Sequence, residues 1–238
     1  MALGLGINTA PLVTPLKWLP SDLVNQRLYL WLQNGVGLAT GAWLDSSSEE
    51  NNATQVVSGN RPTVSQGGLE FDQSGILQWM DLTNLITIPE DTGFTLSFTV
   101  TLDNVLNNVI LSDSVSEFIE IMNSKRIRLK TNNPSGLSTT LFFDTAIFTE
   151  NKSVITLQRA RAAGTFTVWV NGEKSIPNAS TVNAVNTGGF DISNVAIRND
   201  NDRALDGLLY ELVLYNTAIN PADINNLNNY MIEKFNIE

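Results

Sequence analysis

Carboxylates are the first candidates for chemistry in this chain, because it contains no histidine and no cysteine. That composition excludes an imidazole base, a Ser-His-Asp triad, His-ligated zinc and thiol chemistry. Paired carboxylates remain, since glycoside hydrolysis needs two of them flanking one bond. Glu117 and Glu120 lie three residues apart in the segment EFIEIM. In a strand this spacing places them on opposite faces, so we expect no catalytic pair here and no enzyme activity.

Other pairs of acidic residues, such as Glu49-Glu50 and Asp200-x-Asp202, stand in loop-like sequence without an aligned partner. One cluster has hard oxygen ligands of the kind that Ca²⁺ prefers: Asn199, Asp200, Asp202 and Asp206. The cluster is not an EF-hand, because Ala204 stands at a liganding position and the following glycine comes too late. A solvated turn rich in Asn and Asp explains the same residues. We therefore expect no cofactor, with Ca²⁺ as the weaker alternative.

The charge balance bears on partners. With 14 Lys and Arg against 24 Asp and Glu, the net charge is −10. This balance argues against nucleic acid, which binds basic stripes that release phosphate counterions. The only basic concentration is Lys125, Arg126, Arg128 and Lys130, and its alternation predicts a solvated strand rather than a binding groove. No apolar run reaches the roughly 18 residues of a membrane span, and the start lacks the basic region of a secretory signal.

Residues 1–17 differ from the rest of the chain. Glycines and prolines interrupt regular structure there, while the apolar side chains are Leu3, Leu5, Ile7, Leu12, Val13 and Leu16. Two interpretations remain open: a tail that packs on its own domain, or an extended arm whose apolar residues dock on another subunit. Because no composition break follows, we expect an arm over residues 1–17 and one domain over 18–238.

The domain consists of short alternating segments separated by turns. Residues 94–102 (FTLSFTVTL) alternate cleanly, and Asn171-Gly172 is a two-residue hairpin signal. The other expected strands are 69–71, 76–79, 109–111, 117–122, 126–131, 139–143, 153–159, 165–170, 174–176, 195–198 and 208–215. A dozen strands without βαβ alternation predict an all-β sandwich of two sheets.

The chain ends with a strand and a capped helix. In residues 208–215 the pattern places Leu208, Tyr210, Leu212 and Leu214 on one face and Leu209, Glu211, Val213 and Tyr215 on the other. Asn220 supplies an N-cap, Pro221 the first helical position, and Asp223 suits the positive helix end. The apolar helix face is Ile224, Leu227, Met231 and Phe235. We expect this ending to close the sandwich, with none of its polar residues converging on a site.

Five tryptophans are the candidates for a sugar platform. We expect Trp43, Trp79 and Trp169 in the core, with exposure more natural for Trp18 and Trp31. No set of residues identifies a glycan site.

Several motifs in order resemble the concanavalin A-like, or laminin-G-like, jelly-roll superfamily. They are Trp43-Leu44-Asp45 with the polar stretch after it, Arg61-Pro62-Thr63, Gly68-Leu69-Glu70-Phe71-Asp72, Asn171-Gly172, and Asp206-Gly207 before the last strand and helix. The resemblance covers most of residues 40–238 and implies a jelly-roll sandwich. The superfamily includes lectins, adhesion modules, glycosidases, polysaccharide lyases and virion proteins, so the resemblance alone settles no function. Glycosidases of this kind carry Glu-x-Asp-x-Glu, from which the segment at Glu117 departs.

The opening Met-Ala-Leu-Gly-Leu-Gly resembles the N-termini of virion proteins from tailed phages, particularly those of cyanobacteria. Our hypothesis is a non-enzymatic virion protein, made in the host cytoplasm. It would be a capsid decoration protein or a fibre component that docks on capsid or tail proteins, or on copies of itself. The alternative is a carbohydrate-binding or adhesion module that recognises surface glycans.

Overall fold

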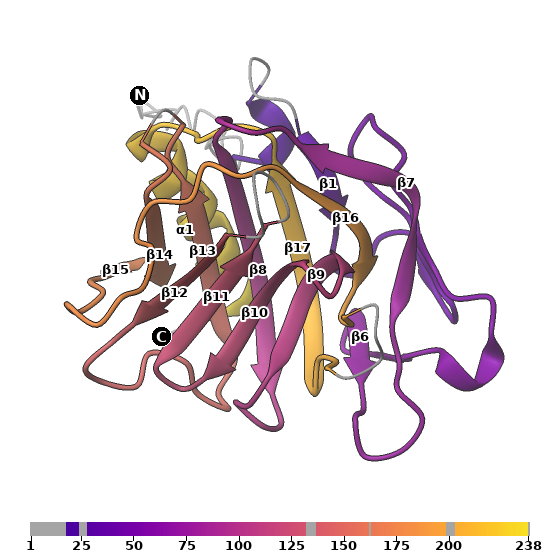
Figure 1. Cartoon of the computed structure of the whole chain (residues 1–238). Helices are drawn as coiled ribbons and strands as arrows, with labels where there is room; N and C mark the ends of the chain where they lie inside the picture. Colours follow the sequence, from indigo (N-terminus) through magenta and orange to yellow (C-terminus); the bar gives the residue numbers. More distant parts are fainter. Residues whose placement is uncertain (1–17, 24–27, 132–136, 162, 199–202, 238) are drawn as a thin grey trace, which may run out of the picture.

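The computed structural model describes residues 18–23, 28–131, 137–161, 163–198 and 203–237. Two antiparallel sheets face each other as a sandwich, and one C-terminal helix lies outside it (Figure 1). The predicted fold class, an all-β two-sheet sandwich with a terminal helix, is confirmed. The expected arm of residues 1–17 lies outside the described residues, so the boundary at residue 18 stays a prediction.

Sheet A has the order β15-β14-β13-β8-β17-β6-β5, with β1 also paired to β17. Its strands are β1 (Leu28–Leu32), β5 (Thr63–Ser65), β6 (Gly68–Phe71), β8 (Phe94–Leu102), β13 (Ser153–Arg159), β14 (Phe166–Val170), β15 (Glu173–Ser175) and β17 (Gly207–Tyr215). Two short 3₁₀ helices, η1 (Pro20–Asp22) and η2 (Ser58–Asn60), lie outside the sheets.

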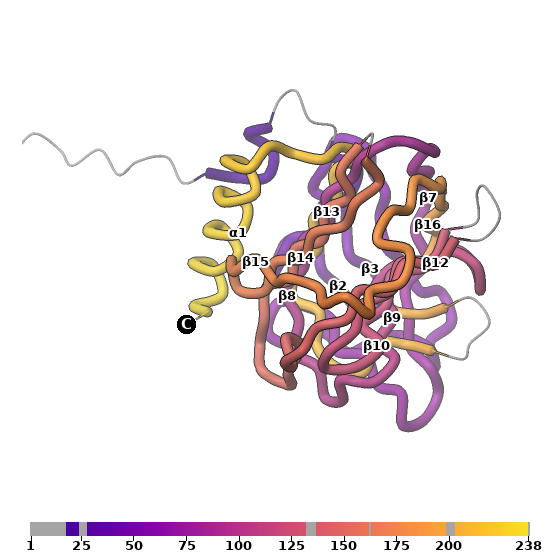
Figure 2. Tube along the Cα trace, turned by 60° about the vertical axis from the view of Figure 1, so that its left-hand side comes forward, coloured from indigo at the N-terminus to yellow at the C-terminus, as the bar shows by residue number. Residues whose placement is uncertain are grey.

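Sheet B has the order β12-β11-β10-β9-β16-β7-β4-β3-β2. Its strands are β2 (Leu38–Ala39), β3 (Ala42–Trp43), β4 (Ala53–Thr54), β7 (Met80–Ile88), β9 (Asn108–Ser114), β10 (Glu117–Asn123), β11 (Arg126–Lys130), β12 (Ser138–Phe142) and β16 (Phe190–Val195). The helix α1 (Pro221–Phe235) lies against sheet A, on the side away from sheet B (Figure 2). Within the described chain, the outer face of sheet B therefore has no helix over it.

The helix forms as its sequence predicts. The Asn220 side chain accepts a hydrogen bond from the backbone N–H of Asp223 at 3.0 Å, and Pro221 is the first helical residue. Ile224, Leu227 and Met231 are buried against sheet A. Among the described residues no helix is both long and apolar enough to cross a membrane.

Strand β8 is buried on both faces, which follows from the helix. Phe94, Leu96 and Phe98 fill the core between the sheets. The alternate residues Thr95, Ser97 and Thr99 are also buried, on the face that α1 covers. Each hydroxyl has a partner there: Thr217 carbonyl for Thr95, the Thr156 hydroxyl for Ser97 and the Met231 sulfur for Thr99. Buried polar groups are tolerated because they are bonded.

A bulge in β17 makes one prediction wrong. The pairing with β8 shifts between Leu209 and Glu211, which adds one residue to this strand. Leu209 therefore joins Leu212 and Leu214 in the core between the sheets, and Leu208 and Tyr210 do not. Val213 and Tyr215 lie under the helix. The bulge breaks the alternation of residues 208–215. The prediction missed it because nothing in the sequence indicates the inserted residue.

Three other expectations were wrong. Residues 76–79 are not a strand, since β7 begins at Met80, and the strand expected at 195–198 is β16, which ends at Val195. Trp31 is buried rather than exposed, because β1 lies beside β17 where the helix covers the sheet. The hairpin at Asn171-Gly172 is confirmed, with both residues at positive φ.

Two motifs of the resemblance lie side by side. Gly207 pairs with Phe71, and Leu209 pairs with Leu69, so the start of β17 runs along β6. Gly207 has φ of +141°, and a Cβ there would lie 2.1 Å from the Thr101 carbonyl oxygen. Only glycine fits this approach.

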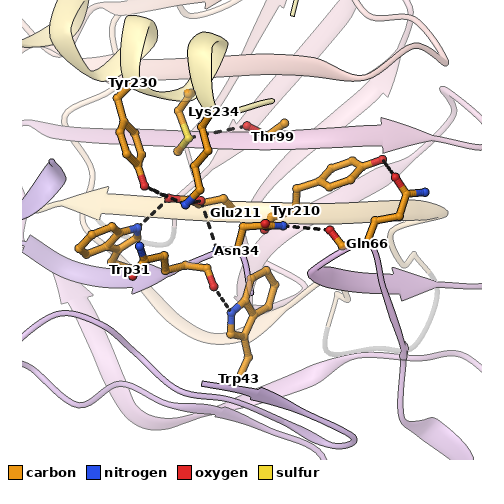
Figure 3. Close-up of polar contacts among 11 residues, drawn as sticks. Trp31, Asn34, Trp43, Gln66, Thr99, Tyr210, Glu211, Tyr230 and Lys234 are labelled. Carbon is orange, nitrogen blue, oxygen red and sulfur yellow. Dashed lines mark hydrogen bonds and ion pairs between the residues drawn. The ribbon is translucent and has the colours of Figure 1, made fainter. Parts of the chain in front are cut away.

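Glu211 is the most connected buried charge in the described fold (Figure 3). Its carboxylate accepts hydrogen bonds from Trp31 Nε1 at 2.8 Å, Tyr230 Oη at 2.7 Å and the Asn34 backbone N–H at 3.2 Å. Lys234 Nζ completes the set as an ion pair at 2.5 Å. These donors belong to β1, the turn after it and α1, so one side chain joins three segments. The ending therefore contains a structural polar network that its sequence pattern did not predict.

Burial beside Glu211 also changes the pKa of Tyr230. Loss of solvent raises the pKa of the Tyr230 phenol, and the neighbouring Glu211 carboxylate raises this pKa further. The phenol therefore stays protonated at neutral pH and donates its hydrogen bond to Glu211. The buried charge is thus neutralised by one lysine and solvated by three neutral donors, which is what a buried ion requires.

We expect Glu211→Gln to lower the free energy of unfolding by about 2–4 kcal/mol, because the amide group would face the donors of Lys234 and Asn34. Glu173→Gln, the same change at an exposed position on β15, is the matched control and should stay within about 0.5 kcal/mol of wild type. Urea denaturation measures both. Equal stability of the two variants would show that the Glu211 network does not hold the fold.

Candidate functional site

Most of the predicted site residues lie outside the described residues. These are Leu3, Leu5, Ile7, Leu12, Val13, Leu16, Asn199, Asp200 and Asp202. The exception is Asp206, whose carboxylate accepts a hydrogen bond from the Gln73 backbone N–H at 3.4 Å. Burial raises the pKa of Asp206. The part of the chain that is described contains no group of three acidic residues placed to hold a metal ion, so the arm and calcium hypotheses stay predictions.

Glu117 and Glu120 have separate surroundings. Glu117 accepts hydrogen bonds from the Asp191 backbone N–H and the Ser114 hydroxyl, both at 3.2 Å. Both oxygens of the fully buried Glu120 are held in ion pairs, with Arg128 at 2.6 Å and Arg203 at 2.5 Å. Neither carboxylate is set to attack a substrate or to share one with the other, as the spacing predicted.

On the outer face of sheet B, cationic side chains lie over the aromatic rings of Phe118 on β10 and Phe142 on β12. The Arg128 and Arg198 guanidinium carbons lie 4.9 Å and 5.6 Å from the centre of the Phe118 ring. Arg126 lies 4.6 Å from the Phe142 ring. Phe118 is only 1% exposed beneath these side chains. The basic strand is thus more than the solvated surface that its alternation predicted.

A cleft of about 350 Å³ opens where β1 of sheet A approaches β7 of sheet B. Its polar groups come from far-separated parts of the chain: Tyr29 on β1, Glu49 and Asn51 in the loop before β4, and Asn84 and Thr87 on β7. Leu85 and Ile86 add apolar surface. A hollow of this size, lined mainly by polar residues beside an aromatic ring, suits a small polar ligand.

The loop that walls this cleft, residues 45–52, is organised by one carboxylate. Asp45 accepts four hydrogen bonds, from the backbone N–H groups of Trp31, Ser47 and Asn51 at 2.8–2.9 Å and from the Ser47 hydroxyl at 2.6 Å. Asn51 in turn donates to the Tyr29 carbonyl at 2.7 Å. The loop is therefore held to β1 before any ligand arrives.

A larger hollow of about 480 Å³ lies at the end of α1. It is lined by Lys152, Asn171, Phe235 and Asn236, among others, and reaches Ile237. Ile237 is the last described residue. The residues that line the cleft beside Tyr29 all lie on strands or in the ordered loop, so this cleft is the better candidate.

The sequence marked part of the cleft and missed the rest. The polar stretch after Trp43-Leu44-Asp45 was noticed only as part of a structural motif. Tyr29 and Asn84 could not be joined to it, because their meeting depends on the packing of sheet A against sheet B. The run of Asp45, Ser47, Asn51 and Asn52, all able to bond backbone groups, was the available signal of an ordered loop.

Comparison with known proteins gives a fold. No protein-family model matches the chain, and no curated protein sequence matches it. Similar solved structures include the binding domain of Paraclostridial Mosquitocidal Protein 1, with a TM-score of 0.57 and 16% identity over 87% of this chain and 52% of that one. Botulinum neurotoxin type C, which depends on two ganglioside molecules to get into cells, gives 0.54 and 16% over 87% and 52%. A Trypanosoma rangeli sialidase gives 0.54 and 16% over 87% and 33%.

The chain spans about half the length of the two toxin structures and a third of the sialidase. At 16% identity the likeness concerns the fold. It agrees with the jelly-roll sandwich expected from the motifs, and the chain is a jelly-roll β-sandwich of the kind found in binding domains of these toxins.

Glu117 provides a pH test of its surroundings. Burial raises the pKa of Glu117 above its ordinary value of about 4.3, with Asp191 and Asp113 adding repulsion. The ionised group therefore costs stability above the folded-state pKa, and that cost disappears as pH falls through this pKa towards 4.3. Compared with wild type, Glu117→Gln should be relatively more stable at pH 7 than at pH 4.3. Urea denaturation across this range measures it, with the exposed Glu150→Gln as control; a constant difference at every pH would contradict the assignment.

Proposed function

We propose that this chain is a non-catalytic carbohydrate-binding module whose ligand occupies the cleft between β1, the loop 45–52 and β7. The observation that carries the proposal is the chemistry of the cleft, where an aromatic ring stands beside amide and carboxylate groups. Amides donate and accept hydrogen bonds, and a carboxylate accepts two or more, which matches neighbouring hydroxyl groups of a sugar. Tyr29 and Leu85 offer apolar surface for the carbon face of the ring.

Preorganisation supports this function. A site whose walls are ordered before binding does not lose further conformational entropy when the ligand arrives. The loop meets this condition, because Asp45 bonds it internally and Asn51 ties it to β1. Asn52 adds a contact on the other side, since its carbonyl accepts hydrogen bonds from Thr83 of β7 at 2.8 and 3.0 Å. Both sheets thus hold the loop.

The same cleft favours binding over hydrolysis. Of the described residues that line it, only Glu49 carries a carboxyl group. Glycoside hydrolysis requires two carboxylates on either side of the scissile bond. The ion-paired Glu120 cannot supply the second, because it lies on β10 with both oxygens engaged.

The similar structures add context. Gangliosides are lipids with sugar head groups, and dependence on them is a property of botulinum neurotoxin type C. The fold is therefore compatible with glycan recognition, and in this chain the polar groups that could meet a sugar lie in the cleft beside Tyr29. The virion hypothesis rests on residues 1–17, which lie outside the described residues, so capsid or tail partners stay a prediction from the sequence.

A glycan array probed with the full chain tests the proposal, followed by calorimetric titration of the strongest neutral glycan. Asn84→Ala should weaken that affinity about three- to tenfold, the value of one hydrogen bond. Asn84 is exposed on β7, so its loss should leave the fold intact.

Asn226→Ala, the same substitution on the exposed face of α1, is the matched control and should leave the affinity unchanged. Leu85→Asp, which places a charge at the exposed rim of the cleft, should abolish binding. No neutral glycan on the array, or a glycan whose affinity survives both cleft variants, would overturn the proposal.

A further inference from the structure

Strand β11 carries a row of cations on the outer face of sheet B. Arg126, Arg128 and Lys130 alternate with Ile127 and Leu129, which are buried in the core between the sheets. The three cations therefore point away from the core. Successive side chains on one face of a strand stand about 7 Å apart, so the row is about 14 Å long.

The central cation of the row is committed to the fold. Arg128 lies directly across from Glu120 and holds one carboxylate oxygen with Nε and Nη2, at 3.1 and 2.6 Å. Because Glu120 is fully buried, removal of Arg128 would leave a buried charge with less compensation. Arg128 has a structural role that explains its presence.

The flanking cations have no such explanation. Lys125 donates to the Asp144 carbonyl at 2.8 Å and Lys130 to the Val115 carbonyl at 3.1 Å, both neutral groups. Arg126 lies over the Phe142 ring, which is also neutral. Among the described residues these three cations make no ion pair, although the protein carries 24 acidic residues and a net charge of −10.

Like charges along one strand repel each other, so this arrangement gains nothing for stability. The contacts that position Lys125, Arg126 and Lys130 are neutral and leave these three charges uncompensated. An anionic partner laid along the row would relieve the repulsion and would meet Arg126 and Lys130 at opposite ends, with Arg128 between them.

The chemistry of the surface indicates the kind of anion. The Phe118 ring is 1% exposed and lies under cations, and the Phe142 ring is covered by Arg126. Among the described residues of this surface, both rings thus already have cations over them, which disfavours the stacking of bases that single-stranded nucleic acids require. Guanidinium and ammonium groups bind carboxylates by charge-assisted hydrogen bonds.

We propose that Arg126 and Lys130 of β11, together with Lys125 in the turn before it, form a second binding surface, which takes an acidic polysaccharide through its carboxylate groups. The surface belongs to β11 of sheet B and is separate from the cleft beside Tyr29. The chain would then bind neutral sugar in the cleft and an acidic glycan chain along this row.

Polygalacturonate is the probe, with dextran sulfate, an oligothymidylate and neutral dextran as comparisons, all at low ionic strength. The double variant Arg126→Gln/Lys130→Gln should weaken the affinity for polygalacturonate on the order of tenfold. The control Arg161→Gln/Lys174→Gln removes two charges from exposed positions outside the row, so it has the same net charge and should bind as wild type. Added salt should weaken wild-type binding.

Several results would overturn the proposal: no binding of polygalacturonate, equal binding by the two double variants, or equal binding of neutral dextran. Tighter binding of dextran sulfate would overturn the choice of carboxylate. If oligothymidylate bound as tightly as polygalacturonate, and the Arg126→Gln/Lys130→Gln variant lost this binding, the row would be a nucleic-acid site instead. Asn84→Ala should leave the polygalacturonate affinity unchanged, which separates failure of this surface from failure of the cleft.

Discussion

The buried carboxylate of Glu211 is the constraint on which the rest of the structure depends. A charge in this position must be met by donors, and these come from β1, the turn after it and α1. Trp31 extends the constraint, because its indole bonds Glu211 while its backbone N–H bonds Asp45. The loop that walls the cleft is thus anchored, through one tryptophan, to the carboxylate that holds the helix on sheet A.

This anchoring divides the molecule into two kinds of surface. Where α1 covers sheet A, the outward polar residues of β8 are buried and bonded rather than available to partners. The edge beside β1 and the outer face of sheet B stay accessible, and they differ in chemistry. The cleft has neutral amides, a ring and one carboxylate, while β11 has cations that neutral groups hold in place. Two surfaces of such different character suit different parts of a glycan.

Features set by neighbouring residues could be predicted from the sequence. The alternation of residues 94–102, the positive φ at Asn171-Gly172 and the cap at Asn220 are local, and each is confirmed. The bulge in β17, the burial of Trp31 and the meeting of Tyr29 with Asn84 depend on contacts between distant segments. Glu211 was visible as a lone charge among apolar residues, yet its partners lie on two other elements. The candidate site was missed for the same reason.

The central claim is that a sugar occupies the cleft beside Tyr29. Its most direct test is a titration of the isotopically labelled chain with the bound neutral glycan, followed by NMR chemical shifts of the backbone and side-chain amides. We predict that the Asn51 and Asn84 side-chain amides and the backbone amides of Tyr29 and Leu85 shift together and saturate at one affinity. Shifts confined to other parts of the chain, with these four residues unmoved, would contradict the claim.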